Sequence, residues 1–225
     1  MAELGGDDAR HLTRVLRAEA GQRYEITDGQ AAYLAEIAEA RGERVVFRVI
    51  EPIASAAPAV EIALCAALVK FDRFEWIIEK ATELGVAAIL PVEAARSEKG
   101  LLEASRKRAG RWERIARESS QQARRVAAPR ILEAVRFEGA LAHAAGHRYF
   151  LDEAGAPPLL RVLPAEKAAG DSVALLVGPE GGWTDAERAA AAAAGWQPAG
   201  LGPLVLRAET AAIAALAVIG SVWLR

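Results

Sequence analysis

Short stretches of alternating hydrophobic and polar residues occupy the first fifty positions of the chain. Their β-branched and aromatic residues predict strands, over residues 22–27, 32–38 and 44–50. Asp28-Gly29 and Arg41-Gly42 separate these stretches and are typical of hairpin turns. A short helix over residues 12–18 is expected before the first strand. Short strands joined by tight turns predict a compact β-barrel.

From residue 59 onward, apolar stretches that suit buried strands alternate with helical patterns. Strands are predicted over residues 60–69, 87–92, 130–135, 148–151, 173–177 and 198–201, and helices over residues 72–84, 102–125, 185–194 and 209–224. In the first of these helices, Asp72 is the expected N-cap and Gly85 follows the expected end. This alternation is typical of a mostly parallel sheet covered on both faces, so the predicted fold class is α/β.

These patterns divide the chain into a β-barrel domain (residues 1–51), a linker (residues 52–58) and an α/β domain (residues 59–225). The 225 residues are 52% hydrophobic and carry a net charge of −2, which indicates a soluble globular protein. The longest apolar stretch, residues 211–224, is too short to predict a membrane span. The chain also opens without the pattern of a secretory leader, so we expect no membrane association.

Cysteine and histidine offer little for metal chemistry in this chain. Cys65 is the single cysteine and lies in an apolar stretch, so we expect a buried thiol. A single cysteine forms no internal disulfide and fits a reducing, cytoplasmic location. His143 and His147 are four residues apart without a nearby carboxylate or cysteine, which favours surface residues over metal ligands. We therefore expect no metal site.

Charge is distributed unevenly along the chain. Residues 96–136 contain twelve Lys or Arg against five Glu, and the remainder contains sixteen bases against twenty-five acids. A solvated helix face is the usual reason for a run of charges, but these cations are dense and mostly of one sign. The pattern favours a phosphate-binding surface. Aromatic residues are scarce nearby, which favours recognition of folded RNA over stacking on single strands.

Glycines gather where a predicted strand meets a predicted helix. Gly178, Gly181 and Gly182 follow the strand over residues 173–177, and Thr184 begins a capping-box pattern. Open α/β sheets bind ligands at such positions. The loop lacks the Lys-Ser/Thr pair of a P-loop and the glycine spacing of the dinucleotide motif. It therefore suits backbone contacts to a ligand that is poor in phosphate, and a tight turn without a ligand is the alternative.

A second motif, LGPLVLRAETA over residues 201–211, places polar residues in an apolar segment. Burying such groups is costly unless they are paired or used. Together with GPEGGW over residues 178–183, it resembles the paired motifs of the knotted SPOUT-class RNA methyltransferases. The match is closest to the RsmE branch, which forms 3-methyluridine in small-subunit (16S) ribosomal RNA. Further matching segments follow in order: residues 11–17, 70–85 and 96–97, Gln122 and Arg125.

The resemblance also has two departures. The basic-aromatic first strand that is usual in the family is not matched at residues 1–4. Arg124 stands where the family often has glycine.

The resemblance implies a PUA-like RNA-binding domain followed by a SPOUT α/β domain with a trefoil knot at its C-terminus. It also implies transfer of a methyl group from S-adenosylmethionine to N3 of a uridine. Backbone groups of the two motifs would hold this cofactor. The expected cofactor-binding residues are Gly178, Pro179, Gly181, Gly182, Leu201, Gly202, Leu204, Val205 and Leu206.

Methyl transfer is a one-step displacement, so alignment of the reacting atoms should supply most of the catalysis. Arg207 is the candidate for stabilising negative charge on the uridine carbonyl oxygens as N3 loses its proton. Glu180 and Glu209 are candidates for the base or for orienting Arg207. The alternative role of Glu209 is a favourable charge at a helix N-terminus. The sequence does not indicate which residue is the general base.

The expected partners are ribosomal RNA or the small ribosomal subunit, and a second copy of the chain. The expected RNA-binding residues are Arg14, Arg17, Arg96, Arg108, Arg111, Arg114 and Arg125. Residues 211–219 are apolar on nearly every helical face, so this helix must be covered all round. Its own sheet could supply the cover, but the resemblance implies a homodimer with the active site at the interface.

Two other functions compete with this one. The first is a SPOUT methyltransferase that acts on transfer RNA or on a ribose 2′-hydroxyl, and the matches over residues 11–17 and 70–85 argue against it. The second is a non-catalytic RNA-binding or ribosome-assembly protein, which the intact segment Arg207–Thr210 argues against.

Overall fold

The computed structural model describes residues 1–54, 60–168 and 170–224. The chain divides into two compact units, residues 1–57 and 58–225. Residues 55–58 of the expected linker lie outside the described residues, whereas Pro52 and Ile53 continue a strand of the first unit. Within the described parts, no helix is long and apolar enough to cross a membrane.

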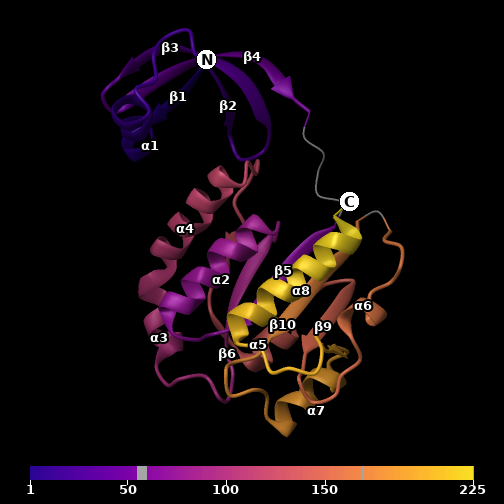
Figure 1. Ribbon diagram of the computed structural model, residues 1–225. Coiled ribbons are helices and arrows are strands. Elements are labelled where there is room, and N and C mark those ends of the chain that lie inside the picture. The colour runs from indigo at the N-terminus through magenta and orange to yellow at the C-terminus, as the bar shows by residue number, and fades with distance from the viewer. Residues whose placement is uncertain (55–59, 169, 225) are drawn as a thin grey trace. The chain divides into compact units, whose positions relative to one another are not determined.

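The first unit is a four-stranded antiparallel half-barrel with the strand order β1-β4-β3-β2 (Figure 1). Register shifts in the β3–β4 ladder interrupt its regular pairing. The core contains Ile37, Val45 and Phe47. The elements are β1 (Ala2–Gly5), α1 (Gly6–Arg10), a π-helix (His11–Val15), β2 (Arg23–Thr27), β3 (Ala32–Arg41) and β4 (Arg44–Ile53).

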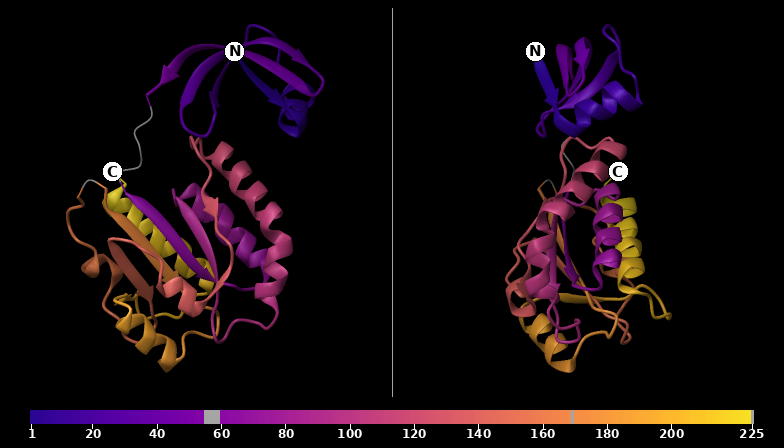
Figure 2. Two further views of the ribbon diagram at one scale, coloured as in Figure 1. Left: turned by 180° about the vertical axis from the view of Figure 1, so that it is seen from behind. Right: turned by 90° about the vertical axis from the view of Figure 1, so that its left-hand side faces the viewer.

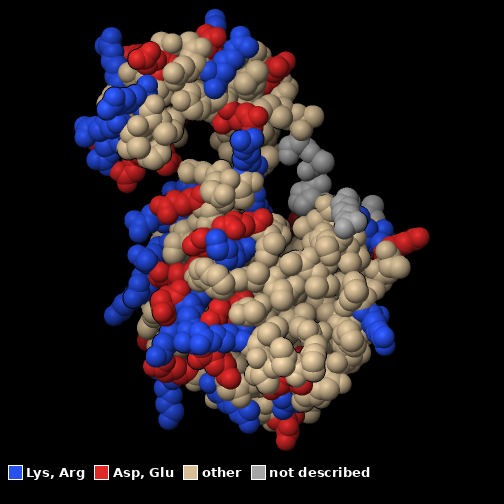
Figure 3. Space-filling model, in the orientation of Figure 1, with Lys and Arg blue, Asp and Glu red and all other residues tan. Residues whose placement is uncertain are grey.

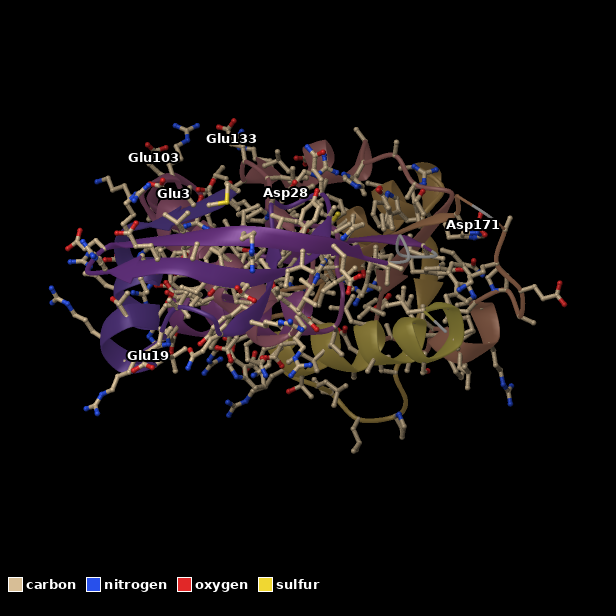
Figure 4. The ribbon with its side chains drawn as sticks, turned by 90° about the horizontal axis from the view of Figure 1, so that it is seen from above. Glu3, Glu19, Asp28, Glu103, Glu133 and Asp171 are labelled. Atoms are coloured by element: carbon tan, nitrogen blue, oxygen red, sulfur yellow. The ribbon has the colours of Figure 1, made fainter. Side chains whose placement is uncertain are left out.

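The three predicted strands are present in this unit, and β3 and β4 are longer than expected. The sequence did not predict β1, because four residues with only Ala2 and Leu4 turned inward carry too little periodicity to recognise. Glu3 (labelled in Figure 4) joins β1 to β4 by accepting a hydrogen bond from Arg44 at 2.9 Å. A first strand is therefore present, although it lacks the basic-aromatic residues that the resemblance led us to expect.

The predicted hairpin turn at Asp28 joins β2 to β3. The carboxylate of Asp28 accepts hydrogen bonds from the N–H groups of Ala31 and Gln30, both at 2.9 Å (Asp28 is labelled in Figure 4). These contacts hold the pKa of Asp28 below its usual value. Gly29 supplies the positive φ, +88°, that the turn requires. The turn therefore fixes the register of the two strands.

The second unit contains a parallel sheet with the strand order β11-β9-β10-β5-β6-β7, and β8 also pairs with β6 (Figures 1 and 2). The strands are β5 (Glu61–Ala67), β6 (Ala88–Glu93), β7 (Arg130–Ile131), β8 (Val135–Arg136), β9 (His147–Leu151), β10 (Ser172–Val177) and β11 (Gln197–Ala199). The helices are α2 (Phe71–Glu83), α3 (Leu101–Ser105), α4 (Ala109–Gln122), α5 (Phe137–Leu141), α6 (Leu159–Val162), α7 (Asp185–Ala193) and α8 (Ala208–Trp223).

Helices cover both faces of this sheet, which confirms the predicted α/β class. Alternate residues of β5 belong to different cores, because successive side chains of a strand point to opposite faces. Leu64 packs in the core that includes residues of α2, α4 and α8. Cys65 packs in the opposite core with residues of α5 and α7. Burial raises the pKa of the Cys65 thiol to about 12, so it is a core side chain as expected.

The structure corrects several local predictions. The strand expected over residues 130–135 is divided into β7 and β8, and the helix expected over residues 12–18 is replaced by α1 and the π-helix. The helix expected over residues 102–125 is divided into α3, a 3₁₀ turn (Arg106–Arg108) and α4. The N-cap of α2 is Lys70 and not Asp72. Asp72 lies in the first turn of the helix, where the helix dipole favours a carboxylate. Strand order alone does not determine how the chain threads through its own loops, so the trefoil knot stays a prediction.

Candidate functional site

Three neighbouring parallel strands, β10, β9 and β11, end at one edge of the sheet. Ligands of open α/β sheets bind outside the carboxyl ends of the strands, and here the loops that leave these ends surround one pocket. The pocket is lined by Leu151, Asp152, Glu153, Val177, Gly178, Pro179, Glu180, Gly181, Gly182, Trp183, Ala199, Leu201, Gly202, Leu204, Val205, Leu206, Ala208 and Ala211. This set contains all nine residues expected to bind a cofactor, and also Glu180.

The loop after β10 needs glycine because it packs closely on its surroundings. A Cβ atom at Gly178 would lie 2.9 Å from the ring of Trp183. That indole is fully buried and donates a hydrogen bond to the carbonyl of Leu151 at 2.8 Å. At Gly182, φ is +67° and a Cβ atom would lie 2.6 Å from Oε1 of Glu153. Both glycines therefore bring the backbone against neighbours that a side chain would displace.

Two arginines from other elements hold the same loop. Arg73 of α2 forms an ion pair with Glu180. Arg96, which follows β6, donates a hydrogen bond to the carbonyl oxygen of Gly181 at 2.7 Å. Sequence reasoning missed Arg73 as a site residue and placed Arg96 on the RNA surface. Both contacts join residues more than eighty positions apart, so no local pattern could have identified them.

The buried carboxylate of Glu187 connects the loop after β6 to the start of α7. The predicted capping box is confirmed, with Thr184 N–H donating to Glu187 at 2.8 Å and Glu187 N–H donating to the Thr184 hydroxyl at 3.2 Å. The other carboxylate oxygen accepts a hydrogen bond from Ala95 N–H at 2.8 Å. Because Ala95 precedes Arg96, Glu187 also positions the arginine that holds Gly181.

Acidic residues supply the charge of the pocket wall. Asp152 accepts two hydrogen bonds from Arg188 of α7, at 2.8 and 3.1 Å. Burial alone would raise the pKa of Asp152, but the hydrogen bonds from Arg188 and from Ala154 N–H lower it below its usual value. Glu153 and Glu180 are the other acids, and no lysine or arginine belongs to the described lining. The wall therefore suits a ligand that carries positive charge.

The two catalytic candidates of the second motif flank this pocket without lining it. Arg207 is exposed and is the N-cap of α8, between the lining residues Leu206 and Ala208. Glu209 is buried in the first turn of α8, and its Oε2 atom has no hydrogen-bond partner among the described residues. A buried carboxylate oxygen is costly without a partner, which singles out Glu209 among the acids of this unit.

The basic surface predicted over residues 96–136 is less uniform than the sequence indicated. Arg111 forms an ion pair with Glu75 of α2 at 2.7 Å, and Arg108 approaches the same carboxylate at 3.6 Å. Arg114 approaches Glu118 at 4.0 Å. Figure 3 accordingly shows blue and red residues intermixed over α2 and α4. Linear counting overstated the excess of positive charge, because Glu75 is distant in sequence.

Arg125, which was expected to bind RNA, makes its described contacts within its own unit. Its guanidinium donates hydrogen bonds to the carbonyl oxygens of Thr82 at 2.7 Å and Val86 at 2.8 Å. These carbonyls lie at the end of α2 and just beyond it, and burial lowers the pKa of Arg125. The side chain thus satisfies carbonyl groups at the end of a helix within its own unit.

Arg14 and Arg17 lie on the exposed surface of the first unit. Between them, Val15 and Leu16 are 65% and 55% exposed. Arg10 and Arg23, by contrast, form ion pairs with acidic residues of the same unit. Exposed basic and apolar side chains therefore occur together at residues 14–17.

Comparison with known proteins decides the family. Residues 56–220 match the model of an RNA methyltransferase domain, and residues 4–50 match that of an RNA methyltransferase PUA domain. The chain is 30% identical to ribosomal RNA small subunit methyltransferase E of Bacillus subtilis (strain 168), over 96% of this chain and 88% of that protein. This chain belongs to the ribosomal RNA small subunit methyltransferase E family.

Two further members of the methyltransferase E family illustrate the match. The protein from Synechocystis sp. (strain ATCC 27184 / PCC 6803 / Kazusa) is 34% identical, over 94% of this chain and 70% of its own length. The Neisseria gonorrhoeae protein, whose crystal structure has S-adenosyl methionine bound, is 28% identical in sequence, and its structure matches this one with a TM-score of 0.88. That comparison covers 99% of this chain and 92% of the Neisseria chain, so the likeness extends over both units. The predicted PUA-like and α/β domains are confirmed.

We expect Gly182→Val to weaken binding of S-adenosylmethionine roughly tenfold or more, because the new side chain would displace Glu153 and strain the backbone. Calorimetry measures the affinity. Gly155→Val is the matched control, since Gly155 also has a positive φ, +82°, but no atom lies within 4 Å of its Cβ position. Wild-type affinity in a folded Gly182→Val variant would contradict the role of this loop.

Proposed function

We propose that this protein transfers a methyl group from S-adenosylmethionine to N3 of a uridine in small-subunit (16S) ribosomal RNA. The observation that carries the proposal is the pocket formed by the two sequence motifs at the carboxyl ends of β9, β10 and β11. Membership in the methyltransferase E family supports the substrate class, and the bound cofactor of the Neisseria relative supports the ligand.

The residues of the pocket fit this cofactor. S-adenosylmethionine supplies a methyl group from a sulfonium cation and is left as a neutral thioether. The lining offers three carboxylates, which favour a cation, and two loops whose glycines allow close backbone contact. The expected residues Leu201, Gly202, Leu204, Val205 and Leu206 would form one side of the cofactor site, and the loop Gly178–Gly182 would form the other.

Arg207 is the residue that we assign to charge stabilisation on the uridine. When N3 loses its proton and its electron pair forms the new bond to carbon, negative charge develops on the neighbouring carbonyl oxygens. An exposed guanidinium beside the pocket would stabilise that charge. Glu209 orients Arg207 or accepts the proton, and its buried oxygen, which has no partner among the described residues, supports such a role. Glu180 is already paired with Arg73, which favours loop positioning over proton transfer.

RNA binding involves both units. Arg14 and Arg17 would contact RNA on the PUA-like unit. Arg108, Arg111 and Arg114 would contact phosphates on the second unit, although Glu75 partly neutralises the first two. Arg96 is engaged with Gly181 and would link a bound phosphate to the cofactor loop. The substrate is ribosomal RNA or the small ribosomal subunit, in the cytoplasm.

The active protein is a homodimer that uses the open face of α8. Leu216 and six other residues of this helix are buried within the chain, so its own unit covers only one side. Ala217 is exposed on the other side, and Leu204 and Val205, which precede the helix, are 75% and 82% exposed. Figure 3 shows a broad area without charged residues over α8. A second copy would cover this apolar surface and complete the pocket.

A strain that lacks this protein should lose one 3-methyluridine from its small-subunit ribosomal RNA, as mapped by nuclease digestion and mass spectrometry. Wild-type protein should restore the modification, and Arg207→Ala should reduce the rate of transfer by about 10²-fold because it removes a charge-stabilising donor. Methylation of a ribose hydroxyl or of transfer RNA instead would contradict the proposal. Unchanged modification in the strain would favour a non-catalytic RNA-binding protein.

Arg117 is a further exposed arginine of α4, beside Arg114. Replacing Arg114 and Arg117 by Glu should weaken RNA binding and reduce its salt dependence by roughly two ion contacts, with cofactor affinity unchanged. Filter binding over a range of salt concentrations measures both effects. Glu75→Gln is the control, because it removes the acid that neutralises Arg108 and Arg111 and should maintain or strengthen binding. Normal RNA affinity in the reversed variant would exclude α4 as the RNA surface.

Light scattering should give about twice the chain mass of 23.9 kDa. Ala217→Arg should abolish both the dimer and methyl transfer, because it places a charge on the open face of α8. Leu216 is unsuitable for this test, since it is fully buried within its own chain and a charge there would unfold the unit. Ala192→Arg on the exposed face of α7 is the control. A fully active monomer would refute this assembly.

A further inference from the structure

The three carboxylates of the pocket are not equally neutralised. Asp152 is held by Arg188 through two short hydrogen bonds, and Glu180 is paired with Arg73. Glu153 lies 3.5 Å from Arg188, longer than the roughly 2.7–2.9 Å of a charge-assisted hydrogen bond. Arg188 also serves Asp152, so its charge is already compensated. Glu153 therefore shares its cation with Asp152 and Asp185, and it is the least compensated carboxylate in the described lining of the pocket.

Glu153 is also held where a bound ligand would meet it. Its Oε1 atom lies 2.6 Å from the position of a Cβ atom at Gly182, against the loop that we assign to the cofactor. Its side chain is 44% exposed, and the pocket is the surface that it lines. Because Gly182 has no side chain, the carboxylate of Glu153 can occupy this position.

We propose that Glu153 is the residue by which the pocket distinguishes the cationic sulfonium cofactor from its neutral thioether product. The inference rests on the proposed function, because it takes the pocket to bind S-adenosylmethionine. Cofactor and product share their adenosine and amino-acid parts and differ by the methyl group and its positive charge. A carboxylate that shares its one described cation with two other acids attracts that charge and gives no corresponding attraction to the thioether. Glu153 would thus favour exchange of product for fresh cofactor.

The test compares the affinities of Glu153→Gln for S-adenosylmethionine and S-adenosylhomocysteine by calorimetry. We expect affinity for the sulfonium compound to fall about fivefold or more and affinity for the thioether to change less than about twofold. Glu153→Asp keeps the charge and should retain more of the preference than the glutamine variant. An equal loss for both compounds, or no loss for either, would overturn the proposal, since Glu153 would then contact a shared part of the ligand or none.

Asp185→Asn is the matched control for this test. Asp185 contacts the same Arg188 at 3.2 Å, but its side chain is fully exposed and does not line the pocket. This variant should leave both affinities unchanged, and a selective loss here would assign the effect to Arg188 instead. Retained thioether binding by Glu153→Gln shows that the variant is folded. Failure of the wild-type protein to bind either compound would refute the proposed function itself, which separates the two outcomes.

Discussion

The packing of one indole against one glycine determines the form of the pocket. Trp183 lies beneath Gly178, where no side chain could fit, and its N–H donates to the carbonyl of Leu151 at the end of β9. The ring also stacks on Phe150 with 4.7 Å between centroids. A single buried side chain thereby fixes the loop after β10 against the end of the neighbouring strand. The other pocket contacts depend on this placement.

Charged side chains then hold the loop from outside the pocket. Arg73 of α2 contacts Glu180 of this loop, and Arg96, which follows β6, contacts the carbonyl of Gly181. Neither arginine belongs to the described lining of the pocket, so the charged residues of that lining are all acidic. This arrangement combines a rigid backbone with a wall that attracts a cation. Rigid placement suits methyl transfer, because the displacement depends mainly on alignment.

Helix α8 connects the pocket proposed for the cofactor to the surface proposed for dimerisation. Ala208 and Ala211 line the pocket, whereas Ala217 lies on the exposed face further along the same helix. A partner seated on that face would also cover the exposed segment at Leu204 and Val205. The buried oxygen of Glu209 lies at the start of the helix. Assembly and completion of the site would thus occur together.

The sequence by itself determined the α/β class, most strands and helices, and all nine pocket residues expected to bind a cofactor. These features are local: alternation gives strands, helical spacing gives helices, and each of the two motifs directly follows a strand, β10 or β11. The resemblance to the family also predicted that the first domain is PUA-like. Element ends were less predictable, as the divided helix over residues 102–125 shows, because small changes in local geometry carry little sequence signal.

Only the tertiary structure decided what each charged side chain does. Arg125 lies in a basic stretch that suggested RNA contact, but its guanidinium donates to carbonyl groups at the end of α2. Glu75 of α2 forms an ion pair with an arginine of α4. Arg73, Glu153 and Glu187 gained their roles from partners distant in sequence. The reason is physical: hydrophobic periodicity is read along one segment, whereas an ion pair or a hydrogen bond depends on which segments the fold brings within about 3 Å.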